Sequence, residues 1–562
     1  MRTARVTDML AVPDWLPVQQ LAIVLSVAVA AVVLLGLDPR RRSWGETLRR
    51  RLLFGLPLGT LATTAFVLAV YLFVQSGLGS WYRPVTIPFR AWSYFYPLGL
   101  ATAAFSHMGP GHLIGNLIGT LTLAPLVEYA WGHYPRRRGA SAFSSWRTNP
   151  YVRALVVFPT VVVAVGLLTA VFAVGPIIGF SGVVFAFAGF ALVYYPFTTV
   201  LALVGGQVLR VAYQAFLTPR VVASASPTFS VPWWAQIAIQ GHALGLLLGV
   251  LFGLYVLRRR GDDPPTPLRL WTGVLIFGVY QSLWAVYWFR GGQTYVLFRA
   301  YGLALVVLLA TLVTVAGSAP TPRRDGAEAS LRRTLRRPNW RVGGLLLLLG
   351  TGLVAGPSIP VNLSAASDEP LPGDRIEVRD YEVTYAENVT SGMVSVVDVE
   401  AFGESTQVRT SGVVVRSERR GIWTTAVSKG QLSFAGRRSL DLGGVGWRER
   451  VVANRTGWNV VGASTVYRVN LTHRETTRTV YTSSPSQAEP TIAGRNISFA
   501  PGSKQFQVAV GRNNRTVATG PLPRANETVM LDGLLLVRNQ SRVYAVYDGT
   551  RVRVASKESY RD

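Results

Sequence analysis

Long apolar runs separated by short polar segments occupy the chain up to about residue 360. Ten of these runs approach the length of about twenty residues that a helix needs to cross the hydrocarbon of a bilayer. They predict ten membrane-spanning helices at residues 17–37, 52–75, 112–131, 152–174, 177–195, 197–217, 233–257, 268–289, 295–317 and 342–360. The first run is about twenty residues long, long enough to span a bilayer, which favours a retained helix over a signal peptide.

The pattern changes after residue 360. Segments such as 375–385, 412–416 and 543–547 alternate or cluster β-forming residues between turns rich in Gly, Pro, Asn and Asp. This pattern is typical of short antiparallel strands. We therefore predict an all-α polytopic membrane core followed by a β-rich, sandwich-like extracytoplasmic domain of one or two modules, in which we find no catalytic constellation.

The charge distribution predicts how the chain crosses the membrane. The formal net charge is +27, most of the excess lies in arginine clusters between apolar runs, and no nucleic-acid-binding signature accompanies it. Such clusters mark cytoplasmic loops. We expect a multi-pass protein of the cell membrane whose N-terminus, segments 76–110 and 218–232, and residues after 360 lie outside. The arginines that set this orientation are Arg40, Arg41, Arg42, Arg49, Arg50, Arg51, Arg136, Arg137, Arg138, Arg258, Arg259, Arg260, Arg323, Arg324, Arg332, Arg333, Arg336 and Arg337.

Asn-x-Ser/Thr sequences give a second indication of sidedness, because N-glycosylation occurs on exterior segments. These Asn-x-Ser/Thr sequences follow residue 360, in agreement with the arginine pattern. Whether any of them carries a glycan stays open. They lie at Asn362, Asn388, Asn454, Asn470, Asn496, Asn514, Asn526 and Asn539.

The composition also excludes several kinds of chemistry. The chain has no cysteine, which rules out disulfides, thiolate catalysis and cysteine-ligated metals. Its five histidines leave little for a histidine-rich metal site. We therefore expect neither a metal nor a cofactor.

A serine and a histidine lie on two predicted spans at comparable depth. Ser181 is about 8 Å along its helix if that helix starts near Pro176, and His242 is about 13 Å beyond Trp233 at the same rise per residue. Hydrolysis of a peptide bond needs a nucleophile, a base, an oxyanion site and water, so the pair has to lie near one membrane face. The imidazole would accept the hydroxyl proton.

Small residues follow both side chains at helical spacing, and such stripes let two membrane helices approach closely. Packed against each other, the two stripes would bring Ser181 and His242 within hydrogen-bond reach. On their own, the stripes are also ordinary packing devices, in which case His242 would merely bond within the bundle. The stripes consist of Gly182, Ala186 and Gly189 on one span and Gly245, Gly249 and Gly253 on the other.

The third span adds two polar side chains near the same level. His112 and Asn116 are four residues apart and therefore face the same way on a helix. Neutral donors of this kind stabilise the oxyanion of a tetrahedral intermediate, here together with the backbone N–H of Ser181. As an isolated pair they would serve as polar contacts between helices. Three polar sets at one membrane depth favour a functional site.

These motifs resemble those of the rhomboid family of intramembrane serine proteases. The resemblance implies a dyad of Ser181 and His242 without a carboxylate, an oxyanion site from His112 and Asn116, and a supporting role for His107. Glu128, which is followed by Gly132, resembles the acidic residue that holds the family's first exterior loop; otherwise it is an interfacial cap near the helix end. The motifs are His-x4-His-x3-Asn at His107, His112 and Asn116, Gly-x-Ser-Gly at Gly179 to Gly182, and His-x2-Gly-x3-Gly at His242, Gly245 and Gly249.

The resemblance covers roughly residues 52–260, which correspond to the six-helix core of the family. It implies four parts: an extra helix with an Arg-rich loop at 1–51, the core at 52–260, three more helices at 261–360, and the β-rich domain at 361–562. It says nothing about the last part. One departure is that Arg90-Ala91-Trp92 lies farther upstream of the histidine motif than the family's Trp-Arg pair.

The implied reaction is cleavage of single-pass membrane proteins near the outer face through an acyl-enzyme. A substrate helix would leave the lipid bilayer, pass the sixth span and enter under segment 218–232; nucleic acid is not an expected partner. Two other functions stay open. One is a catalytically silent rhomboid-like protein that binds membrane clients. The other is a transporter, suggested by Gln207, Arg210 and Gln281, although the chain lacks the duplicated halves typical of carriers.

Overall fold

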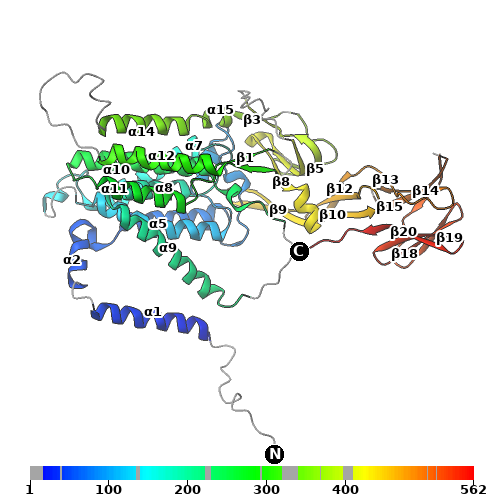
Figure 1. Ribbon diagram of the computed structural model, residues 1–562, viewed down its shortest axis with the longest axis horizontal. Coiled ribbons are helices and arrows are strands. Elements are labelled where there is room, and N and C mark those ends of the chain that lie inside the picture. The colour runs from blue at the N-terminus through cyan, green and yellow to red at the C-terminus, as the bar shows by residue number, and fades with distance from the viewer. Residues whose placement is uncertain are drawn as a thin grey trace, which may run out of the picture.

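The computed structural model is a bundle of helices joined at one end to a β-rich region (Figure 1). It describes residues 17–37, 41–134, 140–221, 229–290, 294–318, 340–367, 369–395, 409–502, 504–513 and 515–561. Seven helices in these ranges are long and apolar enough to cross a membrane: Val18–Leu37 (α1), Pro110–Trp131 (α5), Pro150–Phe172 (ending in α7, Phe158–Phe172), Pro196–Leu217 (α9), Ile239–Arg260 (α10), Arg299–Ser318 (α12) and Trp340–Asn362 (α14, Trp340–Ala355, and α15, Ser358–Asn362).

Three shorter apolar helices complete the set of ten predicted segments. They are Leu58–Val74 (beginning with α3, Leu58–Ala69), Ser181–Tyr194 (α8) and Pro267–Tyr280 (α11). The predicted all-α membrane core is confirmed, and each predicted apolar segment contains one helix. Short helices also occur in the connecting segments and the β-rich region: Arg41–Arg51 (α2), Pro97–Ala103 (α4) and Lys429–Ala435 (α16).

Two helices begin later than the hydropathy pattern predicts. α8 begins at Ser181 rather than residue 177, because Gly175 and Gly179 adopt φ angles of +79° and +135° that are incompatible with a right-handed helix. α10 begins at Ile239 rather than 233, after a 3₁₀ turn at Trp233–Gln236. Ser181 and His242 therefore both lie in the first turn of their helices, and the expected distances of 8 and 13 Å along them were too long.

The predicted span 268–289 is also wrong at its C-terminal end. α11 ends at Tyr280, and Ser282 has a φ of +60°. Residues 287–289 and 295–297, both expected to be helical, instead form the antiparallel pair β1 (Tyr287–Phe289) and β2 (Tyr295–Leu297). All three residues of β1 are aromatic and β2 contains Tyr295 and Val296; aromatic and β-branched residues favour strands.

α8 and α10 pack with their backbones in direct contact. A Cβ at Gly245 would overlap the carbonyl oxygen of Gly182, and one at Gly249 would overlap that of Ala186. In return, Gly189 lies against the carbonyl of Leu246. The small-residue stripes thus meet face to face, and every residue of α8 from Gly182 to Val193 is buried. This contact fixes the relative position of the first turns of both helices.

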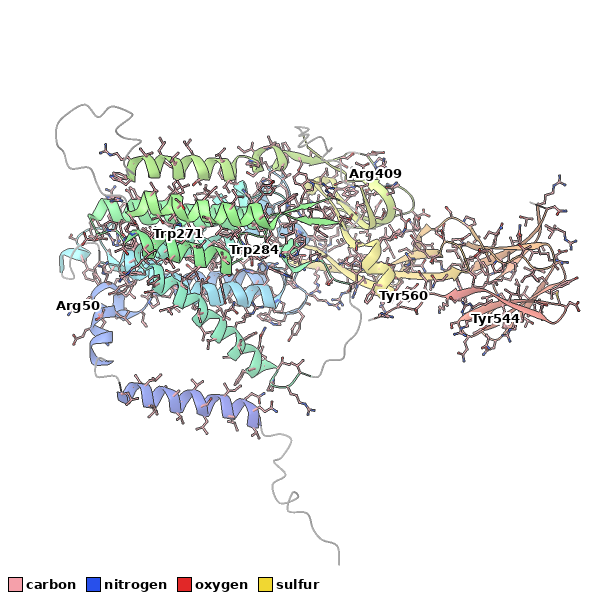
Figure 2. The ribbon with its side chains drawn as sticks, in the orientation of Figure 1. Arg50, Trp271, Trp284, Arg409, Tyr544 and Tyr560 are labelled. Atoms are coloured by element: carbon pink, nitrogen blue, oxygen red, sulfur yellow. The ribbon has the colours of Figure 1, made fainter. Side chains whose placement is uncertain are left out.

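Arginines gather at the end of the bundle that is opposite Ser181 and His242. Arg51, Arg153 and Arg260 donate hydrogen bonds to the last carbonyls of α5, at 3.2 Å to Ala130, 3.0 Å to Gly132 and 2.7 Å to Ala130 respectively. Helix C-termini carry unpaired carbonyls and partial negative charge, which these cations satisfy. Figure 2 labels Arg50 at this end, away from the β-rich region. The predicted arginine loops at 136–138 and 323–337, and Arg40, lie outside the described residues.

The β-rich region is confirmed, and its described strands pair antiparallel. Its larger sheets have the orders β12-β11-β10-β20-β19-β18-β17 with β9 on β10, β4-β5-β7-β8, and β13-β14-β15-β16, besides the pair β3-β6. The strands are Ser364–Ala366 (β3), Ile376–Val378 (β4), Tyr381–Thr390 (β5), Met393–Ser395 (β6), Arg409–Ser417 (β7), Ile422–Ser428 (β8), Arg437–Gly444 (β9), Trp447–Val460 (β10), Val466–His473 (β11), Thr476–Thr482 (β12), Ser486–Gln487 (β13), Arg495–Pro501 (β14), Phe506–Arg512 (β15), Arg515–Pro521 (β16), Thr528–Leu531 (β17), Leu534–Asn539 (β18), Arg542–Tyr547 (β19) and Thr550–Lys557 (β20).

The segment between α3 and α4 shares a hydrophobic core with the β-rich region. Ile87, Trp92 and Tyr96 are buried in one cluster with strand residues that include Tyr381 and Leu442. A second, separate cluster forms the core farther along the chain, around Phe499 and Leu534 among others. Burial of apolar surface is the main stabilising contribution to packing, so this loop segment and the strands that share its cluster stabilise each other.

Asn362 ties the end of the last long helix to the bundle. Its Nδ2 donates to the carbonyl of Ala173 at 2.7 Å, and its own carbonyl accepts from the backbone N–H of Tyr94 at 2.9 Å. The residue is 1% exposed, so its side chain is not accessible to a glycosyltransferase in the folded protein. Among the other acceptor sequences, Asn388, Asn526 and Asn539 are exposed, and Asn514 lies outside the described residues.

Candidate functional site

Ser181 is presented by a tight turn at the start of α8. Gly179 precedes it with a φ of +135°, and a Cβ at this glycine would overlap the imidazole of His112. A side chain at Gly182 would press on Thr169. Glycine at 179 therefore serves two needs, since it allows the positive φ and lets the α5 histidine pack against the backbone just before the serine.

His242 lies directly beside the serine. Its Nε2 is 2.8 Å from Ser181 Oγ, and its ring stacks on Phe185 with centroids 4.2 Å apart and planes 12° apart. The buried Nδ1 has no hydrogen-bond partner among the described residues. In the tautomer that can act as a base, the ring proton sits on Nδ1 and the Ser181 hydroxyl donates to Nε2. The stacking on Phe185 restricts the orientation of the imidazole ring.

His112 and Asn116 occupy one face of the first turns of α5. The His112 ring lies edge-on to His107, with centroids 5.1 Å apart, and against the backbone of Gly179. Asn116 is 7% exposed, and its buried Nδ2 has no hydrogen-bond partner within the described part of the chain. A buried amide donor without a partner is costly, which makes it a candidate to donate a hydrogen bond to a bound group.

His107 is fully buried behind His112, and both of its ring nitrogens lack a partner among the described residues. Its backbone is held by Gln75. The Gln75 Oε1 accepts from the His107 N–H at 2.7 Å, and Nε2 donates to the His107 carbonyl at 2.8 Å. Sequence reasoning missed Gln75, although a buried glutamine at the end of an apolar span is a detectable signal.

Glu128 lies at the other end of α5, so of its two interpretations the contact with the exterior loop is wrong, and the cap near a helix end agrees with the structure. It is sixteen residues beyond His112, or about 24 Å along the helix. Its carboxylate accepts from the backbone N–H groups of Gly59 at 2.7 Å and Thr60 at 2.8 Å, which open α3. His133 donates from Nε2 at 2.6 Å, because its Nδ1 accepts from the N–H of Leu53. Glu128 caps α3 from a neighbouring helix.

We expect Glu128→Gln to destabilise the bundle while leaving the Ser181 end intact. An amide has one acceptor, so its NH₂ group has to face an N–H donor in place of one carboxylate oxygen, at a cost of about 1–3 kcal/mol. Thermal unfolding of the purified protein in detergent measures the loss as a lower Tm. Glu46→Gln on α2 is the control and leaves Tm unchanged; equal Tm values for both variants would contradict the capping role.

One of the comparisons with known proteins gives a match to part of this chain. A family model described as the Rhomboid domain matches residues 92–259, which include the described segments that carry His107, His112, Asn116, Ser181 and His242. No curated protein and no solved structure was found to match the chain. Among the described residues, no group of three or more His, Asp or Glu side chains could hold a metal ion.

Proposed function

Since the chain is a rhomboid-family membrane protein, with its Rhomboid domain at residues 92–259, we propose that it is an intramembrane serine endopeptidase. The observation that carries the proposal is the separation of 2.8 Å between Ser181 Oγ and His242 Nε2. Its substrates are membrane proteins cleaved near the membrane face at which α8 and α10 begin. We also propose that this face is the outer one and that the Arg-rich loops are cytoplasmic.

In the proposed reaction, Ser181 Oγ attacks the scissile carbonyl as His242 Nε2 accepts the hydroxyl proton. The tetrahedral intermediate then expels the amine, which takes that proton from the imidazole. Water attacks the resulting acyl-enzyme in the same way, again with His242 as base, and releases the acid and the free serine. Both side chains lie in the first turns of their helices, which supports access of water from the nearby membrane face.

The oxyanion of the intermediate needs donors that are not already used. Asn116 Nδ2 meets this condition, since it is buried without a partner among the described residues. His112 lies against Gly179, two residues before the nucleophile. The N–H of Ser181 itself opens α8, and the first N–H groups of a helix have no acceptor within it. We propose that these three groups bind the oxyanion, with His107 and Gln75 supporting His112.

Asn116→Ala is expected to lower kcat by about 100-fold to 1,000-fold, which is the cost of one lost oxyanion donor. KM should change little, because the donor acts mainly on the charge that forms in the transition state. Cleavage kinetics of a model transmembrane substrate in detergent measure both constants. Asn149→Ala, which removes a side chain that caps the segment before α7, is the control. A rise in KM at unchanged kcat would assign Asn116 to ground-state binding instead.

α9 supports a route for lateral entry. It contacts α5 through its first half, where Leu203 and Gly206 are buried. Its second half is exposed, with Val208 and Val211 both 63% and Leu217 59% accessible. Figure 1 shows this half of α9 diverging from the bundle. We propose that a substrate helix enters here; residues 222–228 of the segment expected to cover the entrance lie outside the described residues.

A further inference from the structure

A cavity of about 710 Å³ lies where the loop before α4 meets the β-rich region. On one side it is lined by residues 82–92 of the loop and by Met108; on the other it is lined by β8, β9 and β10. The charged residues of its lining are Arg83, Arg90, Arg437, Arg438, Arg450 and Asp441. Five arginines thus face one carboxylate among the described lining residues.

The carboxylate is already engaged. Asp441 accepts hydrogen bonds from Arg448 Nε at 3.2 Å and from Arg450 Nε at 3.0 Å. Arg437 and Arg438 are exposed and form no ion pair with a described residue. The Arg83 guanidinium donates to the neutral Ser439 Oγ at 2.8 Å. The cavity therefore presents excess positive charge to a ligand.

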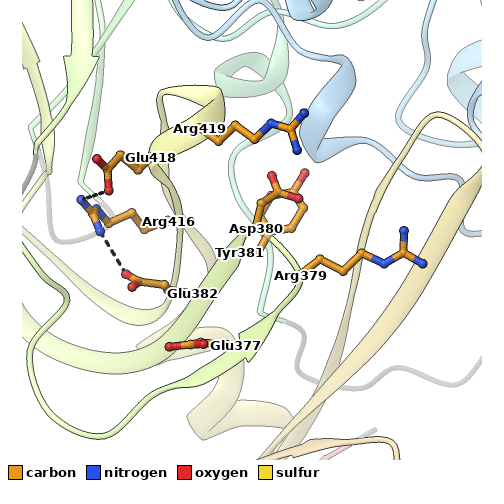
Figure 3. A pocket seen from close by; sticks show the side chains of 8 residues that line it. All are labelled: Glu377, Arg379, Asp380, Tyr381, Glu382, Arg416, Glu418 and Arg419. Carbon is orange, nitrogen blue, oxygen red and sulfur yellow. Dashed lines mark hydrogen bonds and ion pairs between the residues drawn. The ribbon is translucent and has the colours of Figure 1, made fainter.

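A second cavity of similar size provides a comparison, because arginines and carboxylates in its lining form ion pairs with each other. Its volume is about 640 Å³, and arginines and carboxylates line it together. Figure 3 shows Arg416 between Glu382 and Glu418, at 3.1 and 3.5 Å. Burial alone would raise the pKa of Asp380, but hydrogen bonds and charge from Arg420 outweigh it and hold that pKa below its ordinary value. The charges there neutralise one another, unlike those of the arginine-lined cavity.

The walls of the arginine-lined cavity also offer unpaired strand edges. Within the described residues, β8 pairs with β7 and β9 pairs with β10, and neither has a second partner strand. Both line the cavity, through 424–426 and 437–441. A free edge presents backbone N–H and C=O groups that an extended peptide satisfies by adding a strand. This feature favours a polypeptide over a lipid headgroup, which would use the charge alone.

The cavity is close to the candidate catalytic site along the chain and in space. Met108, which lines it, follows His107 directly. Arg90 lines it too, and the next residue, Ala91, forms a β-bridge with Ile177, four residues before Ser181. The part of a substrate that continues outward beyond a cut at Ser181 leaves the bundle at this end.

We propose that the arginine-lined cavity binds the extramembrane segment adjoining the cleaved span of a substrate, as an extended peptide rich in Asp and Glu. The proposal rests on the proposed protease function and adds the chemical class of the recognised segment. Charge selects acidic side chains, and the strand edges hold the backbone. The β-rich region then acts as the part that selects substrates.

A binding measurement tests this without relying on catalysis. The full-length Ser181→Ala protein, in nanodiscs of uncharged lipid, is titrated with a fluorescent twelve-residue peptide that alternates Glu with Thr and Val. We expect saturable binding that weakens with salt, no binding of the peptide with Gln in place of Glu, and a loss of about tenfold or more in Arg437→Glu/Arg438→Glu. Arg512→Glu/Arg515→Glu, on the exposed β15–β16 hairpin, makes the same change in charge and should bind normally.

Three results would overturn the proposal. One is equal weakening by both arginine pairs, which indicates non-specific attraction. Another is equal binding of the Glu and Gln peptides. The third is an effect of Arg437→Glu/Arg438→Glu on binding of phosphatidylglycerol but not of the peptide, which identifies a lipid site. Thermal unfolding of each variant verifies that it is folded.

A cleavage experiment distinguishes failure of this proposal from failure of the proposed protease function. With active protein, model substrates that carry an acidic extramembrane flank should have a lower KM than those with a Gln flank, and the difference should disappear in Arg437→Glu/Arg438→Glu. If both flanks are cleaved equally, the cavity proposal fails while the protease stands. If the peptide binds as expected but Ser181 carries out no cleavage, the proposed function fails instead, and the cavity remains an acidic-peptide site.

Discussion

Replacing Ser181 by Ala is expected to reduce cleavage of a transmembrane substrate by at least about 1,000-fold, without loss of folded protein. The methyl group keeps the volume of the side chain but removes the oxygen that lies 2.8 Å from His242 Nε2. In the proposed mechanism, the acyl-enzyme forms on this oxygen. The measurement is the amount of cleaved product from a tagged single-pass protein co-expressed in membranes, with Tm of the purified variant as the test of folding.

Ser358→Ala is the matched control for this experiment. Ser358 is buried and bonds to the Ala355 carbonyl between α14 and α15, where no catalytic group is proposed. It should cleave at the normal rate. Undiminished cleavage by Ser181→Ala, in a preparation free of other proteases, would contradict the role of this serine. Retention of a cellular function in that variant would favour the catalytically silent binding protein.

Gly245→Ala is expected to lower activity by at least about tenfold and to destabilise the protein by about 1–3 kcal/mol. The new methyl group would overlap the backbone carbonyl of Gly182, which no side-chain rotation can relieve. α8 and α10 must therefore separate, and the separation moves His242 relative to Ser181. Displacements of about 1 Å from a catalytic geometry cost roughly 100-fold in rate.

The control for helix propensity is Gly241→Ala on the same helix. A Cβ at Gly241 would make an ordinary contact of 3.5 Å with Ala173, so activity and Tm should stay normal or rise slightly. Cleavage rate and thermal unfolding are measured for both variants. Equal activity of the two would mean that the close approach of α8 and α10 does not position the dyad.

Much of the helical core follows directly from the sequence. The apolar runs predicted where each of the ten helices lies, and the spacing of Gly182, Gly245 and Gly249 predicted the faces that meet. Both signals depend on local properties, which are hydropathy and helical periodicity. The roles of Ser181, His242, His112 and Asn116 remain proposals, but the closeness of the serine and the imidazole is a feature of the fold.

What the sequence did not predict depends on contacts between distant segments. Hydropathy predicts a helix from residue 177, whereas the positive φ angle of Gly179 delays the start of α8 to Ser181. For Glu128 the sequence left an exterior-loop contact and a helix cap open, because its partners Gly59 and Thr60 are distant in sequence. The shared core of Trp92 and Tyr96 with the β-rich region has no local signature either.

Labelling with a fluorophosphonate probe in membranes tests the central claim most directly, since the probe reacts with an activated serine and needs no knowledge of the substrate. We predict one adduct that peptide mapping places on Ser181, and its loss in His242→Ala although the serine is still present. An adduct on Ser181 of undiminished intensity in His242→Ala, or no adduct on Ser181 in folded wild-type protein, would contradict the account.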